Sequence, residues 1–167
     1  MAVPSTPIQE HHARPSGTGI IRPAVPADCA RLTHIVQTSF AYEGAYRTHA
    51  TALRVTGANL ANEIVRVCED TRGIAGFYSL ICRTGECELD LIYVVNEFIR
   101  TGIGRALFAD LADTARARGY RGILIISHPP ATGFYERMGA RHVGTEPPRG
   151  TASWPRPRLW YELDRGG

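Results

Sequence analysis

The stretch ELDLIYVVNEFIRTGIGRAL, residues 88–107, decides the fold. It begins with apolar and β-branched residues typical of a buried strand, and it ends in a pattern with helical spacing. Gly102 and Gly104 stand where the loop enters the helix, and without a Cβ atom they let backbone N–H groups approach a ligand. The first N–H groups of a helix are unpaired and lie at the positive end of its dipole. The stretch therefore predicts an anion site suited to phosphate.

Two common phosphate-binding motifs do not match this stretch. The dinucleotide fingerprint G-x-G-x-x-G fails because Leu107 stands in the place of the third glycine, and the Walker pattern fails because the sequence has no lysine. Arg100 and Arg105 add two guanidinium groups that can make charge-assisted contacts with an anion. The glycine spacing alone therefore leaves the ligand open.

Strand and helix patterns extend outward from this stretch in both directions. Val, Ile, Tyr and Phe dominate the expected strands, and turn residues separate them. Residues 1–19, rich in Pro, Ser, Thr, Gly and His, are expected to form a flexible tail before one domain over 20–167. The element order predicts an α/β sandwich around a mixed sheet. Strands are expected at 20–23, 64–68, 74–82, 87–95, 122–127, 141–145 and 158–163, and helices at 27–42, 56–63, between Gly102 and Gly119, and at 130–138.

The composition is that of an ordinary globular protein of 167 residues. Hydrophobic residues make up 44% and charged residues 21%, and no apolar run reaches the roughly 20 residues that a membrane helix needs. The N-terminus lacks the basic-then-apolar pattern of a signal peptide, so we expect a cytoplasmic protein without membrane contact. All 19 basic residues are arginine, and the formal net charge of +3 is too small and too scattered to predict nucleic acid binding.

The four cysteines are Cys29, Cys68, Cys82 and Cys87. They form no C-x-x-C pair, and no histidine is spaced with them as in a zinc site, so no metal is expected. Cys82 and Cys87 flank a hairpin turn at 83–86 and could lie opposite each other on paired strands. In a reducing compartment we expect them to remain thiols and to serve as small packing residues.

Two linked motifs resemble those of one family. Residues 88–94, the eight-residue spacing from Val94 to Gly102, and the run GIGRAL at 102–107 resemble motif A of the GNAT N-acetyltransferase superfamily. The run IISHPPATGFYERMGA at 125–140 looks like motif B of that family. The resemblance implies a GNAT-like fold with a mixed, mostly antiparallel sheet of about six or seven strands, flanked by about four helices.

The sequence departs from the family pattern at two positions. Ile99 fills the place of the usual Gln or Arg, and Arg100 follows one position late. His128 stands where Asn or Asp is common. The first change affects one side-chain contact and leaves the backbone loop intact, whereas the second affects a contact to pantetheine or to the helix start.

The resemblance implies transfer of an acetyl group from acetyl-CoA to a primary amine of a small molecule, by direct attack in a ternary complex. The backbone of the glycine loop would hold the pyrophosphate of CoA. A backbone N–H near Val94 or Val95 would polarise the thioester carbonyl, as an oxyanion hole does. The residues thereby assigned to the cofactor are Val94, Val95, Arg100, Thr101, Gly102, Ile103, Gly104, Arg105 and Ala106.

Three residues are candidates for moving protons. Tyr135 occupies the family's usual tyrosine position, and a phenol with a reference pKa of about 10 can donate a proton to the departing thiolate. Packing in the core is the alternative role for this ring. Glu88 and Asp90 share one strand face by the two-residue period, and some family members use a Glu at the position of Glu88 as the base. A solvated strand face explains either carboxylate equally well.

Other residues are expected near the acceptor amine. Tyr42, Glu43 and Tyr46 lie in the segment that usually shapes the acceptor pocket, although a plain helix end is at least as good an interpretation. Trp154 and Trp160 are expected to pack the C-terminal strands, and the loop around Trp154 could border the acceptor cleft.

Alternative functions stay open because the glycine motif reports the donor and not the acceptor. A non-catalytic acyl-CoA-binding domain would keep the loop and would not need Tyr135. Another acyl donor, a hydroxyl acceptor or a protein amine fits the same motifs. A homodimer is common among similar proteins.

Overall fold

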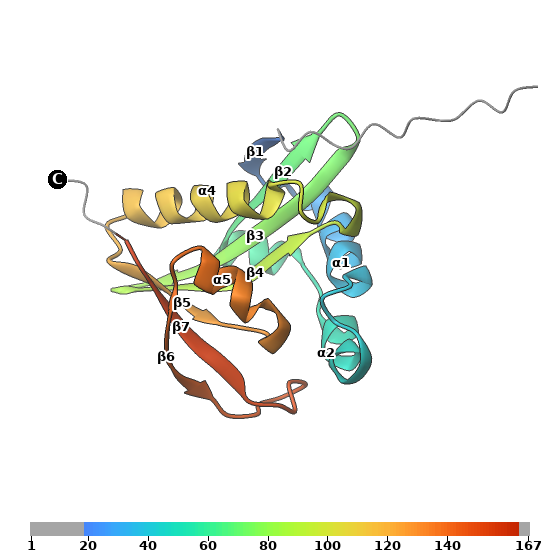
Figure 1. Ribbon diagram of the computed structural model, residues 1–167. Helices are drawn as coiled ribbons and strands as arrows, with labels where there is room; N and C mark the ends of the chain where they lie inside the picture. The colour runs from blue at the N-terminus through green and yellow to red at the C-terminus, as the bar shows by residue number, and fades with distance from the viewer. Residues whose placement is uncertain (1–18, 164–167) are drawn as a thin grey trace, which may run out of the picture.

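The computed structural model describes residues 19–163, which form one seven-stranded mixed sheet covered by helices (Figure 1). The strands are ordered β1-β2-β3-β4-β5-β7-β6, and every neighbouring pair is antiparallel except β4–β5. The expected α/β class with a mixed, mostly antiparallel sheet is confirmed, whereas the expected tail falls almost entirely outside the described residues. The strands are β1 (Ile20–Pro23), β2 (Ile64–Asp70), β3 (Gly73–Arg83), β4 (Glu86–Val94), β5 (Gly122–Ile126), β6 (Arg141–Glu146) and β7 (Arg156–Glu162).

Helices cover both faces of this sheet. α4 and α5 pack on one face and α1 packs on the other (Figure 1). The structure contains the four expected helices and adds α2, between the expected helices at 27–42 and 56–63, where the sequence predicted neither helix nor strand. The α-helices of the described residues are α1 (Cys29–Thr38), α2 (Arg47–Ala52), α3 (Gly57–Asn62), α4 (Ile103–Ala117) and α5 (Thr132–Arg137). Short 3-10 turns occur at Pro26–Asp28, Gly44–Tyr46, Asn96–Phe98 and Pro129–Ala131.

Two core clusters lie back to back across β3. Phe77 packs with the α1 residues on one face, while the adjacent Tyr78 packs under α4 on the other, because successive strand residues point to opposite faces. Leu107 and Leu111 form the buried stripe of α4. Burial of each such side chain stabilises the fold by about 1.5–3 kcal/mol. The position of α4, and so of its N-terminus, is fixed by this stripe.

One polar network lies beneath α4. The Tyr78 hydroxyl donates to Asp110 Oδ2 at 2.6 Å, and Arg66 Nε donates to the same carboxylate at 2.8 Å. Tyr78 is fully buried, so its hydroxyl needs a partner inside the protein. The network ties β2 and β3 to the middle of α4.

β4 contains an irregularity at the point where it separates from β5. Leu91 pairs with Ser79 and Leu89 pairs with Leu80, so Asp90 is an extra residue in β4, as in a β-bulge. On its other side, β4 pairs with β5 only at Glu88 and Leu89. Beyond these two residues the parallel strands separate, and a gap opens in the sheet along the C-terminal half of β4.

The cysteine pair at the β3–β4 turn and Trp160 on β7 lie where the sequence placed them. Cys82 and Cys87 do face each other across the β3–β4 turn, with their Sγ atoms 3.3 Å apart, and both are free thiols. Trp160 of β7 packs over Gly122 of β5, where a Cβ atom would lie 2.1 Å from the indole ring. Among the described residues, no helix combines the length and apolar character that crossing a bilayer requires.

Candidate active site

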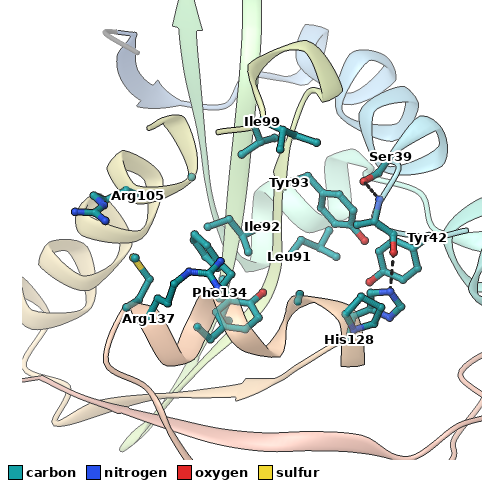
Figure 2. Close-up of a pocket in the computed structure, with 18 of the residues that line it drawn as sticks. Ser39, Tyr42, Leu91, Ile92, Tyr93, Ile99, Arg105, His128, Phe134 and Arg137 are labelled. Carbon is teal, nitrogen blue, oxygen red and sulfur yellow. Dashed lines mark hydrogen bonds between the residues drawn. The ribbon is translucent and has the colours of Figure 1, made fainter. Parts of the chain in front are cut away.

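The gap between β4 and β5 opens into a pocket of about 560 Å³. Residues 89–94 of β4 form one wall, and the loop entering α4 borders one end. Side chains of α5 form the opposite wall, and the segment after α1 closes the other end (Figure 2). In Figure 2, Ile92 lies beside Phe134, whereas Leu91 lies toward Tyr42 and His128 at the closed end.

The loop before α4 adopts a tight left-handed turn. Arg100 has φ of 64° and Gly102 has φ of 96°, and a side chain at such angles is strained. The first intrahelical bond runs from Ala106 N to Gly102 O at 3.0 Å, so the amides before Ala106 have no partner within the helix. These amides and the positive end of a 15-residue helix lie where the sequence predicted an anion site.

The cofactor candidates of this loop contribute in different ways. Arg100, Gly102, Gly104 and Arg105 line the pocket. Thr101 is turned to its own loop, where its Oγ1 donates to Phe98 O at 2.5 Å. Ile103 and Ala106 do not line the pocket, and Ile103 is buried in the core, so only the main chain of these two residues can serve the site. A Cβ at Gly104 would lie 3.4 Å from the Phe134 ring, which leaves little room for a side chain there.

Val94 and Val95, whose backbone N–H groups are the candidates for binding the thioester carbonyl, are not equivalent. Val95 N–H already donates to Ala75 O at 2.8 Å, so it is not free to bind a ligand. Backbone amides alternate in direction along an antiparallel ladder, and the N–H of Val94 therefore points to the β5 side, into the gap. Val94 also lines the pocket, whereas Val95 does not. Of the two, only Val94 is placed to act as the donor.

Tyr135 of α5 lies in the pocket wall with 8% of its surface exposed. Burial raises the pKa of its phenol above the usual value, and the neighbouring Tyr42 adds to this effect. The group therefore holds its proton throughout the physiological pH range. Within residues 19–163, no hydrogen bond engages the Tyr135 hydroxyl, which leaves it able to donate to a ligand.

Asp90 and Glu88 occupy different environments. Asp90 lines the pocket and is exposed there, but the protein atoms around the pocket partly desolvate its carboxyl group. This desolvation, followed by the negative charges of Glu63 and Glu88, raises the pKa of Asp90 to about 6, against an opposing hydrogen bond from Ser79. Glu88 is half-buried and lies outside the pocket wall. A carboxylate with such a pKa is suited to accept a proton near neutral pH, which favours Asp90 as the base.

A family model for the acetyltransferase (GNAT) domain matches residues 38–150, more than half of the chain and the part that carries the pocket. This chain belongs to the GNAT acetyltransferase family. The motif resemblance predicted from the sequence is thereby confirmed. No curated protein sequence gives a significant match.

Solved structures show the same GNAT fold at low sequence identity. The yncA protein of Salmonella typhimurium, solved with its cofactor acetyl-CoA, is 20% identical, with a TM-score of 0.69 over 90% of this chain and 96% of that one. The phosphinothricin acetyltransferase of Sinorhizobium meliloti, in complex with AcCoA, is 24% identical, with a TM-score of 0.67 over 89% and 90%. The ribosomal-protein-S18-alanine N-acetyltransferase of Escherichia coli is 20% identical, with a TM-score of 0.68 over 90% and 97%. The names of the last two proteins state different acceptors, so the shared fold does not define the acceptor.

The closed end of the GNAT pocket is aromatic. The Tyr42 and His128 rings stack with centroids 4.0 Å apart, and Tyr93 lies 5.9 Å from Tyr42. His128 Nε2 lies 2.8 Å from Ala41 O, and because a carbonyl only accepts, Nε2 carries the hydrogen. Burial lowers the pKa of His128, so the ring is neutral at physiological pH. The residue that departs from the family pattern thus anchors the segment after α1.

Other acceptor candidates are only partly brought together. Tyr46 packs edge-on against His128, at 4.4 Å between ring centroids, and against Trp154 at 4.6 Å. Glu43 is exposed and lies outside the pocket wall. Trp154 also contacts the His49 and His128 rings, so its loop borders the closed end of the pocket. Within residues 19–163, no three His, Cys, Asp or Glu side chains are placed to hold a metal ion.

Arg137 is a pocket residue that the sequence did not predict. Arg137 ends α5 and lines the pocket close to Phe134 (Figure 2). Its place in the motif at 125–140 marked it as part of a helix, but only the folded pocket shows that its guanidinium lies across from the glycine loop. It adds a third positive charge to those of Arg100 and Arg105.

Proposed function

We propose that this GNAT protein transfers an acetyl group from acetyl-CoA to a primary amine of a small molecule, by direct attack in a ternary complex. One observation carries this proposal: a single pocket joins the anion site before α4 to Asp90 and Tyr135. A purely structural loop would not require a titratable carboxylate and a protonated phenol in the same cavity.

The residues present fit acetyl-CoA, which supplies the acetyl group as a thioester when bound. The unpaired amides at the start of α4, together with Arg100 and Arg137, would hold its phosphates. The gap-facing N–H of Val94 would bind the carbonyl oxygen and stabilise the charge that develops there. Gly104 and Phe134 both line the pocket, and the chain between these two points would run past them.

Two residues of this chain would move the protons. Asp90 takes one proton from the acceptor ammonium, and its raised pKa makes it a stronger base than an ordinary aspartate. Tyr135 gives one proton to the sulfur that leaves. The new C–N bond forms as the thioester C–S bond breaks, and the second proton of the nitrogen passes to the Tyr135 phenolate. The products are an amide and a free thiol, with one proton left on Asp90.

The proposal is tested by following thiol release from acetyl-CoA across a panel of small amines. We expect thiol release that depends on both protein and amine, with the acetylated amine identified by mass spectrometry. Calorimetry with CoA tests the donor site independently of turnover. Well-folded protein that binds neither CoA nor acetyl-CoA would refute the proposal.

The alternatives give different results in the same experiments. A non-catalytic acyl-CoA-binding domain would bind CoA and release no thiol with any amine. A transferase with another donor would prefer a longer or branched acyl-CoA when several are offered together. An enzyme acting on proteins would acetylate peptide amines and leave the small amines unchanged.

A further inference from the structure

Two cysteines face each other at the end of the β3–β4 hairpin. Arg83 and Glu86 flank the turn, and the next pair along the two strands is Cys82 with Cys87. The two Sγ atoms lie 3.3 Å apart, in hydrogen-bond contact, and both side chains are free thiols. No other two cysteine sulfurs within residues 19–163 are in contact. Neither cysteine lines the pocket, so the proposed acetyl transfer makes no use of this pair.

The strand pairing holds the two side chains where a disulfide forms with little movement. Opposite residues of an antiparallel pair have Cβ atoms about 4.5–5.5 Å apart, and a disulfide requires about 3.5–4.5 Å. An S–S bond is about 2 Å long, so sulfurs at 3.3 Å need to approach by about 1 Å. The sheet already sets the register of the two backbones, so side-chain rotation and a small shift of the strands are sufficient.

The two thiols differ in their access to solvent. Cys82 is half-buried, whereas only 2% of Cys87 is exposed. Burial raises the pKa of the Cys87 thiol, and the hydrogen bond and charge of Cys82 raise it further, against the positive charge of Arg118. Cys87 therefore keeps its proton while Cys82 is a free thiol, and a reagent in solution meets Cys82 first.

Modification of Cys82 makes Cys87 easier to ionise. A sulfur in a mixed disulfide carries no charge, so the effect of the Cys82 charge on the pKa of Cys87 is lost. The positive charge of Arg118 stays and favours the Cys87 thiolate. The sulfur that this thiolate attacks is its direct neighbour, so the second step requires no access from solvent.

We propose that Cys82 and Cys87 are a redox modification site, which forms a reversible intramolecular disulfide by exchange with a small disulfide in solution. The inference goes beyond acetyl transfer and does not depend on it. The hairpin brings together an accessible thiol that reacts first and a buried thiol that completes the bond.

The exchange proceeds in two steps. The Cys82 thiolate attacks one sulfur of the small disulfide, so a mixed disulfide forms and one small thiolate leaves. The Cys87 thiolate then attacks Cys82 Sγ, so the bond between the protein sulfurs forms and the second small thiolate leaves. The two protons lost by the cysteines are taken up by the two small thiolates. Two protein thiols are thus oxidised while one small disulfide is reduced, and an excess of small thiol reverses both steps.

Peptide mapping tests the site directly. Folded protein is incubated with oxidised glutathione, free thiols are blocked by alkylation, and the protein is digested with trypsin without reduction. Trypsin cleaves after Arg83, so the two cysteines fall in separate peptides, 73–83 and 84–100, which only a disulfide joins. Mass spectrometry is expected to find the joined peptides, and excess dithiothreitol to separate them. A stable glutathione adduct in their place, or a bond to Cys29 or Cys68, would overturn the inference.

Single substitutions separate the two steps. In Cys87→Ser the second thiol is absent, so peptide 73–83 is expected to retain one glutathione. In Cys82→Ser the remaining thiol is buried, so peptide 84–100 is expected to take up glutathione at least roughly tenfold more slowly. Cys29→Ser is the matched control and should join the two peptides as the unmodified protein does, because this half-buried thiol of α1 lies outside the pair. Equal uptake by the two hairpin variants would contradict the order of the steps and the accessible role of Cys82.

A comparison of folded and unfolded protein tests whether the hairpin provides the proximity. The equilibrium constant for exchange with glutathione is expected to be at least roughly tenfold larger in the folded protein than in concentrated urea, because closing the loop costs the unfolded chain entropy that the hairpin has already lost. Oxidised protein should accordingly unfold at a higher urea concentration than reduced protein. An equal or smaller constant in the folded protein would show that the strand pairing opposes the bond, and the inference would be wrong. Calorimetry with CoA monitors the fold of each variant without requiring turnover.

Discussion

Replacing Asp90 by Asn tests the central catalytic assignment, because it removes the base and keeps the size of the side chain. In the unmodified protein the carboxyl group has a pKa of about 6. About one tenth of it is ionised at pH 5 and about nine tenths at pH 7, so kcat is expected to rise about tenfold over this range and then level off. The amide introduced by Asp90→Asn cannot accept the proton, so the variant is expected to lose about 100- to 10,000-fold in kcat and to lose the pH dependence below 7.

The same substitution has a consequence for stability with a defined sign. Burial raises the pKa of Asp90 in the folded state above that of the unfolded chain. The folded state therefore binds more protons between the two pKa values, and its stability falls as pH rises through that interval. Above pH 6 the folded protein carries an unfavourable charge that Asn lacks. Asp90→Asn is expected to melt at a higher temperature than the unmodified protein at pH 7.5 and to lose this advantage near pH 4.

The assay is thiol release at saturating acetyl-CoA and amine between pH 5 and 8, paired with thermal melts at the two pH values. Glu88→Gln is the matched control: this carboxylate lies outside the pocket wall and raises the pKa of Asp90 only as a neighbouring charge. It is expected to keep its activity and to move the pH profile slightly to lower pH. An Asp90→Asn variant that retains the activity and pH profile of the unmodified protein would refute Asp90 as the base.

Three further predictions follow from the same structure. Tyr135→Phe is expected to reduce kcat by about 100-fold with unchanged affinity for CoA, because only the proton donor is removed; calorimetry beside the rate assay checks this, and equal losses in binding and rate would contradict it. Gly102→Ala forces a Cβ into a residue with φ of 96°, so urea unfolding should show a loss of about 1–2 kcal/mol together with weaker CoA binding. Gly57→Ala, at a helix start with open space and no positive φ, is its control and should be neutral. Asp110→Asn weakens the network that satisfies the buried Tyr78 hydroxyl, and urea unfolding should show a loss of about 1–3 kcal/mol without a change in kcat.

The elements that could be predicted from the sequence are those with strong local patterns. The long strands β3 and β4 are rich in β-branched and aromatic residues, and α4 has a regular apolar stripe closed by Gly119 with φ of 82°. The anion site combines such elements, because glycine positions and the start of a helix are both visible in a single stretch. The geometry of these elements follows from local backbone conformation and hydrogen bonding, which require no contact with residues distant in the sequence.

The features that escaped prediction depend on distant contacts. α2 (Arg47–Ala52) contains two threonines and a histidine, which are weak helix formers, and no apolar period. Its backbone is held from outside: Gln37 Nε2 donates to Leu53 O at 3.1 Å, just after the helix ends. The unequal roles of Val94 and Val95 likewise follow from pairing with β3, which the sequence of β4 alone does not show.

The closed end of the pocket is the least predictable part of the site. His128 bonds to Ala41 across 87 positions of sequence, and Trp154 contacts Tyr46 across 108 positions (154 − 46). Sequence spacing identifies residues that share an element, and it cannot identify residues that meet through loops. The departure of His128 from the family motif was visible, but its partner was not.

The separation of β4 from β5 also has a consequence for motion. Within residues 19–163, only two paired residue positions join the β1–β4 part of the sheet to the β5–β7–β6 part, so the main-chain amides of β4 that face the gap lack a neighbouring strand. Without a bound partner, these amides should exchange their hydrogens with solvent faster than those in the centre of β3. A molecule bound in the gap would contact both parts of the sheet. Its binding should therefore slow the hydrogen exchange of these amides and reduce the motion of the two parts relative to each other.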